Sequence, residues 1–271
     1  MYTLPPHCHL LRLSCRAVST TRRPSHAAAS PAAPSSLRST WQHRAWVAAG
    51  SAAVLSSLSN SLSIAADTGS FLEPLLAAYL GYLVADLATG VYHWAIDNYG
   101  DASTPVFGSQ IEAFQGHHKY PSTITKRQFA NNLHALARVA AFVVPAADAL
   151  AGGHAGAHAF VGTCAGCVVL SQQFHAWAHE KRGRLPAAVA AMQEARVLVS
   201  RTEHAAHHRE PYDGNYCIVS GAWNRVLDER KVFEAMEMVV FFKFGLRPRS
   251  WSDTAAEWRE EKGGNLTGEY I

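Results

Sequence analysis

The chain has 271 residues, enough for one domain with a substantial core. Its formal net charge is only +3, and much of the excess lies in an arginine-bearing N-terminal stretch, which excludes a typical nucleic-acid-binding protein. Histidine is the unusual residue, with fifteen copies against five cysteines and four methionines. Neutral imidazole is the commonest metal ligand in proteins, so the positions of these histidines decide the interpretation.

The first 66 residues contain six arginines and no Asp or Glu, and they are rich in Ala, Ser and Pro. This composition is typical of an organelle transit peptide, and the Ala/Ser/Pro content favours a plastid over a mitochondrion. Residues 46–66 are uncharged, but their serines make them a poor lipid-facing helix. We therefore expect residues 1–66 to be a transit peptide and linker, with 67–271 as the mature domain; a plain disordered tail is the alternative.

Three apolar segments follow and predict long helices. The first begins near Ser70, the expected N-cap, and carries polar residues at its end; the second covers 133–150 with a kink at Pro145; the third covers 155–178 without any charged residue. Shorter helices are expected at 186–200, as an amphipathic segment, and at 232–244, at a membrane interface. No strand alternation is evident. The predicted fold class is an all-α integral membrane protein, and a soluble helical protein is the alternative.

Eight of the histidines form four short motifs within 120 residues. Two motifs contain an i, i+4 pair, which lies on one side of a helix; one is an adjacent pair; the last is an H-x-x-H-H sequence whose three imidazoles we expect on one helical face. The eight candidate metal ligands are His93, His117, His118, His175, His179, His204, His207 and His208. They exceed the three or four ligands of one zinc ion, so two metal ions are indicated.

The motifs follow apolar helices or lie in the polar segments between them, which predicts a metal site at one membrane face. Nitrogen-rich sites with open positions suit iron and oxygen chemistry, although ligand type leaves other transition metals possible. Histidines that are merely solvated, or that bind a structural metal, are the alternative. His154 and His158 repeat the i, i+4 spacing but lie at the opposite end of the third helix. His134 opens the second helix and is a possible ninth ligand.

From Asp86 to Asp228 the sequence resembles the family that joins the plastid phosphatidylglycerol palmitate Δ3-trans desaturases with the plasmanylethanolamine desaturases. The resemblance is carried by an ordered set of motifs rather than by any one of them. These are D-x-x-x-G-x-Y-H-W-x-x-D-N-Y-G from Asp86, Q-G-H-H-x-x-P from Gln115, H-x-W-x-H from His175, and H-x-x-H-H-x-x-P-Y-x-x-x-Y-C from His204.

The resemblance implies a multi-pass chloroplast membrane enzyme that desaturates a lipid-bound acyl chain, with two iron ions as cofactors and O2 as co-substrate. The implied substrate is a membrane phospholipid, phosphatidylglycerol, and the implied electron donor is ferredoxin. The eight histidines would hold the irons, with Asp97 either joining them or orienting His93. Substrate-binding residues are not implied. Nearby aromatic residues are favoured as membrane-interface anchors over pocket linings; they are Tyr92, Trp94, Trp177 and Tyr216.

Three other functions fit parts of the sequence. A plasmanylethanolamine desaturase would act on an ether lipid and would not need plastid targeting. A histidine-cluster membrane hydroxylase would use the same metal centre but stop after oxygen insertion. A non-enzymatic membrane metal-binding or transport protein would place its histidines along a path through the helices instead of on one face.

Overall fold

The computed structural model describes residues 34–251, which are helical and contain no strand. This confirms the all-α fold class. Four helices are long: α1 (Trp41–Thr68), α2 (Leu72–Asn98), α5 (Phe129–Ala151) and α6 (Ala155–His179). The shorter elements are α3 (Gly108–Lys119), α4 (Thr123–Lys126), α7 (Ala187–Glu194), α8 (Arg201–His207), α9 (Asn224–Glu229), α10 (Val232–Phe244) and the 3-10 turns η1 (Pro34–Leu37), η2 (Arg182–Arg184) and η3 (Arg249–Trp251).

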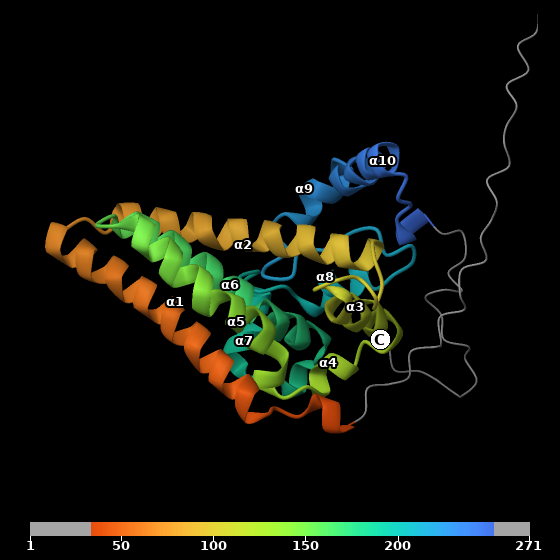
Figure 1. Ribbon diagram of the computed structural model, residues 1–271, viewed down its shortest axis with the longest axis horizontal. Coiled ribbons are helices and arrows are strands. Elements are labelled where there is room, and N and C mark those ends of the chain that lie inside the picture. Colours follow the sequence, from red (N-terminus) through yellow and green to blue (C-terminus); the bar gives the residue numbers. More distant parts are fainter. Residues whose placement is uncertain (1–33, 252–271) are drawn as a thin grey trace, which may run out of the picture.

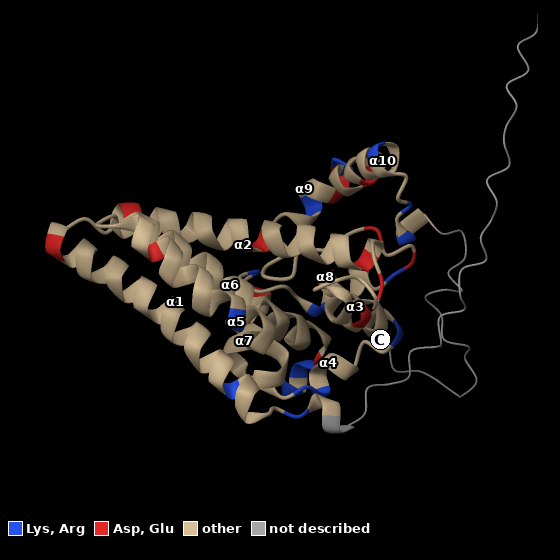
Figure 2. Ribbon diagram, viewed as in Figure 1, with Lys and Arg blue, Asp and Glu red and all other residues tan. Residues whose placement is uncertain are grey.

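The four long helices are each long and apolar enough to cross a membrane. Helix α2 packs along α6, and α1 packs along both α5 and α6. Lys, Arg, Asp and Glu gather at the ends of these helices and in the short elements, and they are nearly absent from the helix shafts (Figure 2). Large apolar side chains such as Leu75, Leu76 and Phe142 are exposed on the shafts, as expected for surfaces that face lipid.

Helix α1 differs from the linker that we expected across residues 46–66. The serines that argued against a lipid-facing helix are turned inward: buried Ser57 donates to Asp148 Oδ1 at 2.7 Å, and buried Ser61 donates to the Ala155 carbonyl at 2.8 Å. Gly50 lies so close to α5 that a Cβ there would meet the Ala137 carbonyl oxygen at 2.3 Å. Small and hydroxyl-bearing residues are the means by which membrane helices pack closely. The transit peptide remains a prediction, because residues 1–33 lie outside the described residues.

The other predicted helices agree with the structure to within a few residues. Helix α6 and helix α10 have almost the expected bounds, and α5 continues through Pro145. Helix α2 begins one residue later than expected, with Phe71 instead of Ser70 at the N-cap. The amphipathic segment expected to reach residue 200 ends at Glu194, because the backbone reverses at Arg196, whose φ is 57°.

Helices α2 and α6 both end at the broad end of the molecule, where α3 and α8 also lie (Figure 1). The long helices converge at the other end, where α1 connects to α2 and α5 connects to α6. Helix α8 starts in a capping box, in which the Ser200 hydroxyl accepts from the Glu203 N–H and the Glu203 carboxylate accepts from the Ser200 N–H. The C-terminal turns of α2 and α6 therefore meet α3 and α8 at one membrane face.

Candidate metal centre

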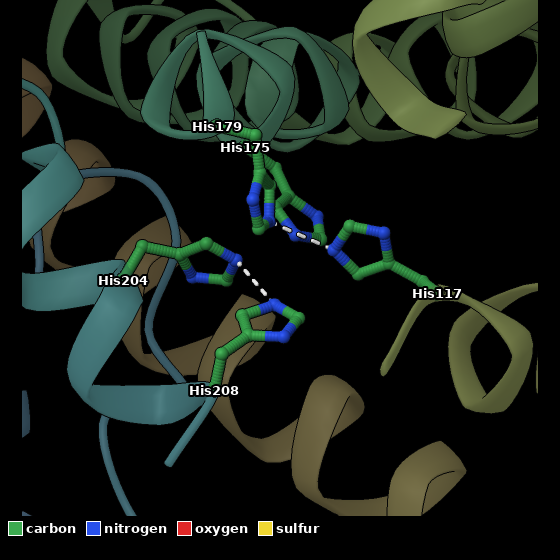
Figure 3. A group of neighbouring side chains, drawn as sticks. All are labelled: His117, His175, His179, His204 and His208. Carbon is green, nitrogen blue, oxygen red and sulfur yellow. Dashed lines mark hydrogen bonds between the residues drawn. The ribbon is translucent and has the colours of Figure 1, made fainter. Parts of the chain in front are cut away.

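Five histidines from three helices form one group of possible metal ligands at this face. Each offers a ring nitrogen, and these nitrogens all lie within 4.8 Å of one another. The rings turn toward a common centre (Figure 3). The group consists of His117 from α3, His175 and His179 from α6, and His204 and His208 from α8 and its C-cap.

The spacing within this five-histidine group suits a single ion. The Nε2 atoms of His117 and His179 lie 2.8 Å apart, and those of His204 and His208 lie 3.2 Å apart. Two ligands at right angles around an ion, each about 2.1 Å from it, would be about 3 Å apart. Both ring nitrogens of buried His175 have no hydrogen-bond partner among the described residues. Such an orphaned imidazole is costly unless it binds an ion.

A second group lies beside the first and contains a carboxylate. Its members are His93, Asp97, His118 and His207, all buried, and their ligand atoms again lie within 4.8 Å of one another. Asp97 Oδ2 is central: it lies 3.0 Å from His118 Nε2, 3.2 Å from His93 Nε2 and 3.4 Å from His207 Nε2. The rings of His118 and His208, one from each group, have centroids 4.8 Å apart, so the two groups are neighbours.

Backbone carbonyls orient two histidines of this four-residue group. His93 Nδ1 lies 3.0 Å from the Tyr216 carbonyl oxygen, and His207 Nδ1 lies 2.8 Å from the Gly214 carbonyl oxygen. A carbonyl only accepts, so each Nδ1 must carry the proton and donate it. In the neutral rings, the Nε2 lone pairs then face Asp97. This arrangement of outer hydrogen bonds is the usual one for histidines that bind metals.

The donor set of the four-residue group requires a positive charge at its centre. Two Nε2 lone pairs and a carboxylate oxygen would otherwise repel each other at about 3 Å. Protonation of His207 is disfavoured, because burial lowers its pKa to about 4. Burial and the neighbouring imidazoles likewise hold the pKa values of His117 and His208 well below their usual range. The residues present therefore fit a metal ion in each group.

The loop that supplies these carbonyls is anchored by Asp86 in α2. Asp86 is fully buried, and its Oδ1 accepts from the backbone N–H groups of Val219, Ser220 and Gly221 at 2.8 to 3.1 Å. Asp86 opens the first of the sequence motifs, but the motif by itself does not indicate a role for it. The available signal was a carboxylate in an apolar helix, which must find partners when it is buried.

The structure brings all eight predicted histidines together and adds Asp97 to one group. It also divides them in a way that spacing did not indicate: adjacent His117 and His118 belong to different groups, as do His207 and His208. The three imidazoles of the H-x-x-H-H motif thus do not serve one ion. The assignment of the eight histidines and Asp97 as metal ligands nevertheless remains a prediction.

His134 belongs to neither group. Its ring stacks on His43 with centroids 3.9 Å apart, and its Nδ1 lies 2.8 Å from the Asn131 carbonyl. At the opposite end of α6, His158 is hydrogen-bonded to Asp148 and to the Gly152 carbonyl, as a histidine with a packing role would be. His154 occupies the N-cap position of α6 without a side-chain capping hydrogen bond, and it is exposed.

Two of the aromatic residues that we favoured as interface anchors are buried instead. Trp94 is 5% exposed and donates from Nε1 to Glu237 Oε1 at 3.2 Å. Tyr216 is fully buried beside His93 and His207, and it donates its hydroxyl to the Tyr212 carbonyl at 2.7 Å. Both residues stabilise the region behind the four-residue group.

Comparison with known proteins agrees with this geometry. A lipid desaturase domain model matches residues 82–251. The chain is 61% identical over 222 residues to the chloroplastic fatty acid desaturase 4 of Arabidopsis thaliana, covering 82% of this chain and 68% of that protein. It is 32% identical over 187 residues to the plasmanylethanolamine desaturase of Myxococcus xanthus, covering 68% of this chain and 66% of that protein. No solved structure matches. The chain belongs to the lipid desaturase family and is an oxidoreductase that desaturates fatty acyl chains.

Proposed function

We propose that this chain introduces a Δ3-trans double bond into palmitate of phosphatidylglycerol in the chloroplast membrane. The observation that carries the proposal is the pair of adjacent histidine-rich groups, each able to hold a metal ion, at the ends of apolar helices. High identity to the chloroplastic fatty acid desaturase 4 supports the acyl substrate and the location. Two further Arabidopsis relatives with chloroplastic names, at 55% and 54% identity, also support the location.

The cofactors are two iron ions, one in each group, held by the eight histidines with Asp97 in the four-residue group. Bound iron would supply the redox chemistry, in which O2 is reduced to two waters. The lipid loses two hydrogens, and an external donor supplies two electrons, accompanied by two protons. In a chloroplast, reduced ferredoxin is the donor that we propose. Imidazole-rich sites with open positions are suited to oxygen chemistry.

The protein's own contribution is to hold the ligands rigidly and to keep water away. Phe114 of α3 is buried, and its ring centroid lies 5.1 Å from that of His93 and 6.2 Å from that of His175. It thereby covers apolar space beside both groups. The four apolar helices place this region at a membrane face, where an acyl chain can approach without leaving the bilayer.

Expression in a host that lacks the product, followed by analysis of intact lipids, tests this function. We expect the wild type to form Δ3-trans hexadecenoate on phosphatidylglycerol and to purify with two irons per chain. His118→Ala, His179→Ala and His207→Ala should lose the product while the protein remains in the membrane. His154→Ala is the matched control, because His154 is exposed at the other membrane face. An unchanged product profile in the three variants would remove these residues from the site.

An ether lipid is the second candidate substrate, because the relative from Myxococcus xanthus is named a plasmanylethanolamine desaturase. The same lipid analysis distinguishes the two. A vinyl ether on ethanolamine phospholipid, without an unsaturated acyl product, would replace the proposed substrate, while a hydroxylated product would indicate a hydroxylase.

A further inference from the structure

A cavity of about 590 Å³ opens beside the five-histidine group. It lies between the N-terminal parts of α1 and α5, helices α3 and α4, and the C-terminal part of α6. His117 and His175 form part of its wall, and both belong to the five-histidine group. The volume is within the usual range for ligand sites. The cavity therefore opens directly onto the proposed metal centre.

The wall of this cavity is mixed in character. Phe114, Ile124 and Leu136 supply apolar surface. Polar side chains line the remainder and include Gln110, Thr123, Asn132 and Gln172. A cavity for acyl carbons alone would not need these polar groups, because each one must then be satisfied inside the protein. The mixture fits the part of a lipid where the acyl chain joins the polar headgroup.

Arg127, which precedes α5, brings a guanidinium to the cavity. It is half-buried, and it forms no ion pair with any carboxylate of the described residues. Its guanidinium Nη1 donates to Asn131 Oδ1 at a long distance of 3.4 Å. This partial burial removes part of the charge from water and lowers the pKa of Arg127. Glu112 also lines the cavity, but it is not paired with Arg127. A partly desolvated guanidinium that pairs with no carboxylate is suited to an incoming anion, and phosphate matches its fork of donors.

Asn131 holds this corner of the cavity in place. Its side-chain Nδ2 donates to the carbonyls of Ser36 and Arg38 at 3.1 and 3.0 Å, and its backbone N–H donates to the Ser39 hydroxyl at 3.0 Å. The segment before α1 is thereby fastened to the start of α5, next to Arg127. The arginine stands on a fixed part of the wall and not on a free loop.

The dimensions agree with the chemistry of the proposed substrate. A roughly spherical cavity of this volume is about 10 Å across. In a phospholipid, about seven or eight bonds separate the third acyl carbon from the phosphorus, a span of roughly 9 Å when extended. A reaction at the third carbon therefore keeps the phosphate within the same cavity as the reacting bond. A reaction in the middle of the acyl chain would place the phosphate well outside it.

We propose that this cavity receives the headgroup end of the lipid substrate and that Arg127 binds its phosphodiester. The inference rests on the proposed function and adds a specificity-determining residue to it. Arg127 acts on lipid binding and on headgroup choice, and it has no part in holding metal. Replacing Arg127 should therefore weaken binding of the lipid substrate without changing the metal content.

The test uses the full-length enzyme with ferredoxin and its reductase, in nanodiscs of phosphatidylglycerol or of an uncharged glycolipid. Arg127→Gln should raise KM for phosphatidylglycerol on the order of tenfold to a hundredfold, which is the range for loss of a charge-assisted hydrogen bond. Iron content and any activity on the glycolipid should not change. Arg127→Lys should give an intermediate KM, because it keeps the charge but loses the fork. Arg225→Gln, at an exposed arginine on α9, is the matched control.

The outcomes separate this inference from the proposed function. If the wild type forms no desaturated lipid, the proposed function fails. If the wild type is active and both Arg127 variants keep its KM and headgroup preference, only the headgroup inference is overturned. Loss of iron in Arg127→Lys would also overturn it, by showing a structural role. Inorganic phosphate tests a free anion as the ligand: if it stabilises the wild type against heat in an Arg127-dependent manner while lipid KM stays unchanged in the variants, the lipid assignment is wrong.

Discussion

The division of the histidines into two groups predicts how iron is lost when ligands are removed in pairs. His118 and His207 both belong to the four-residue group, so replacing both with alanine leaves only His93 and Asp97 as ligands there. Loss of even an outer hydrogen-bond partner lowers metal affinity about 10- to 100-fold. Loss of two direct ligands should then cost at least about 10²- to 10⁴-fold, or roughly 3 to 6 kcal/mol. That is enough to empty the site during purification with a weak chelator.

The five-histidine group shares no side chain with the four-residue group, so it should keep its ion. We expect the His118→Ala/His207→Ala double variant to purify with one iron per chain and without desaturase activity. Adding His175→Ala and His204→Ala should remove the second iron. The assay is iron per chain by elemental analysis, with circular dichroism to confirm that the helices remain. Two irons, or none, in the first double variant would refute the assignment of separate groups.

Three further variants test other parts of the structure. Asp86→Ala should lower the free energy of unfolding by about 3 kcal/mol or more, because it strands three buried N–H groups; thermal melting in detergent measures this. His134→Ala should keep the iron content of the wild type by elemental analysis, since His134 belongs to neither group. A chain that starts at residue 34 should accumulate in the membrane and be active. A chain that starts at residue 67 lacks α1 and should neither accumulate nor be active. Immunoblotting measures the accumulation, and lipid analysis measures the activity.

The sequence was sufficient for the helices whose apolar runs are uninterrupted. The segment 155–178 contains no charged residue, and residues 232–244 are bounded by polar turns, so both were placed within a residue or two. It was insufficient for α1. The number of serines in a helix does not tell which of them face lipid and which face other helices. Ser57 and Ser61 lie on the side of α1 that meets α5 and α6. Which side meets a neighbour is a property of the packed molecule.

The gathering of the eight histidines at one place could be predicted from the sequence, but their division into two groups could not. Successive residues on a helix point about 100° apart, so His117 and His118 cannot face one ion in the same way. His204 and His208 are four residues apart and share a face, while His207 is turned toward the other group. Deciding which ion each ring approaches requires knowing where α3 and α8 dock against α2 and α6. That information lies in long-range contacts and not in the spacing of a motif.

Helix α2 supports the four-residue group in two ways that are physically linked. It supplies His93 and Asp97 directly, and about two helical turns before His93 it supplies Asp86, which fixes residues 219–221 of the loop between α8 and α9. The same loop contains Tyr216, whose carbonyl accepts a hydrogen bond from His93 Nδ1. This hydrogen bond leaves His93 Nε2 as the nitrogen that can bind a metal ion. The ligand and the group that orients it thus depend on a single helix. A shift of the loop would change the orientation of His93 without any change in the ligands, so Asp86 is a positioning residue for the proposed metal centre.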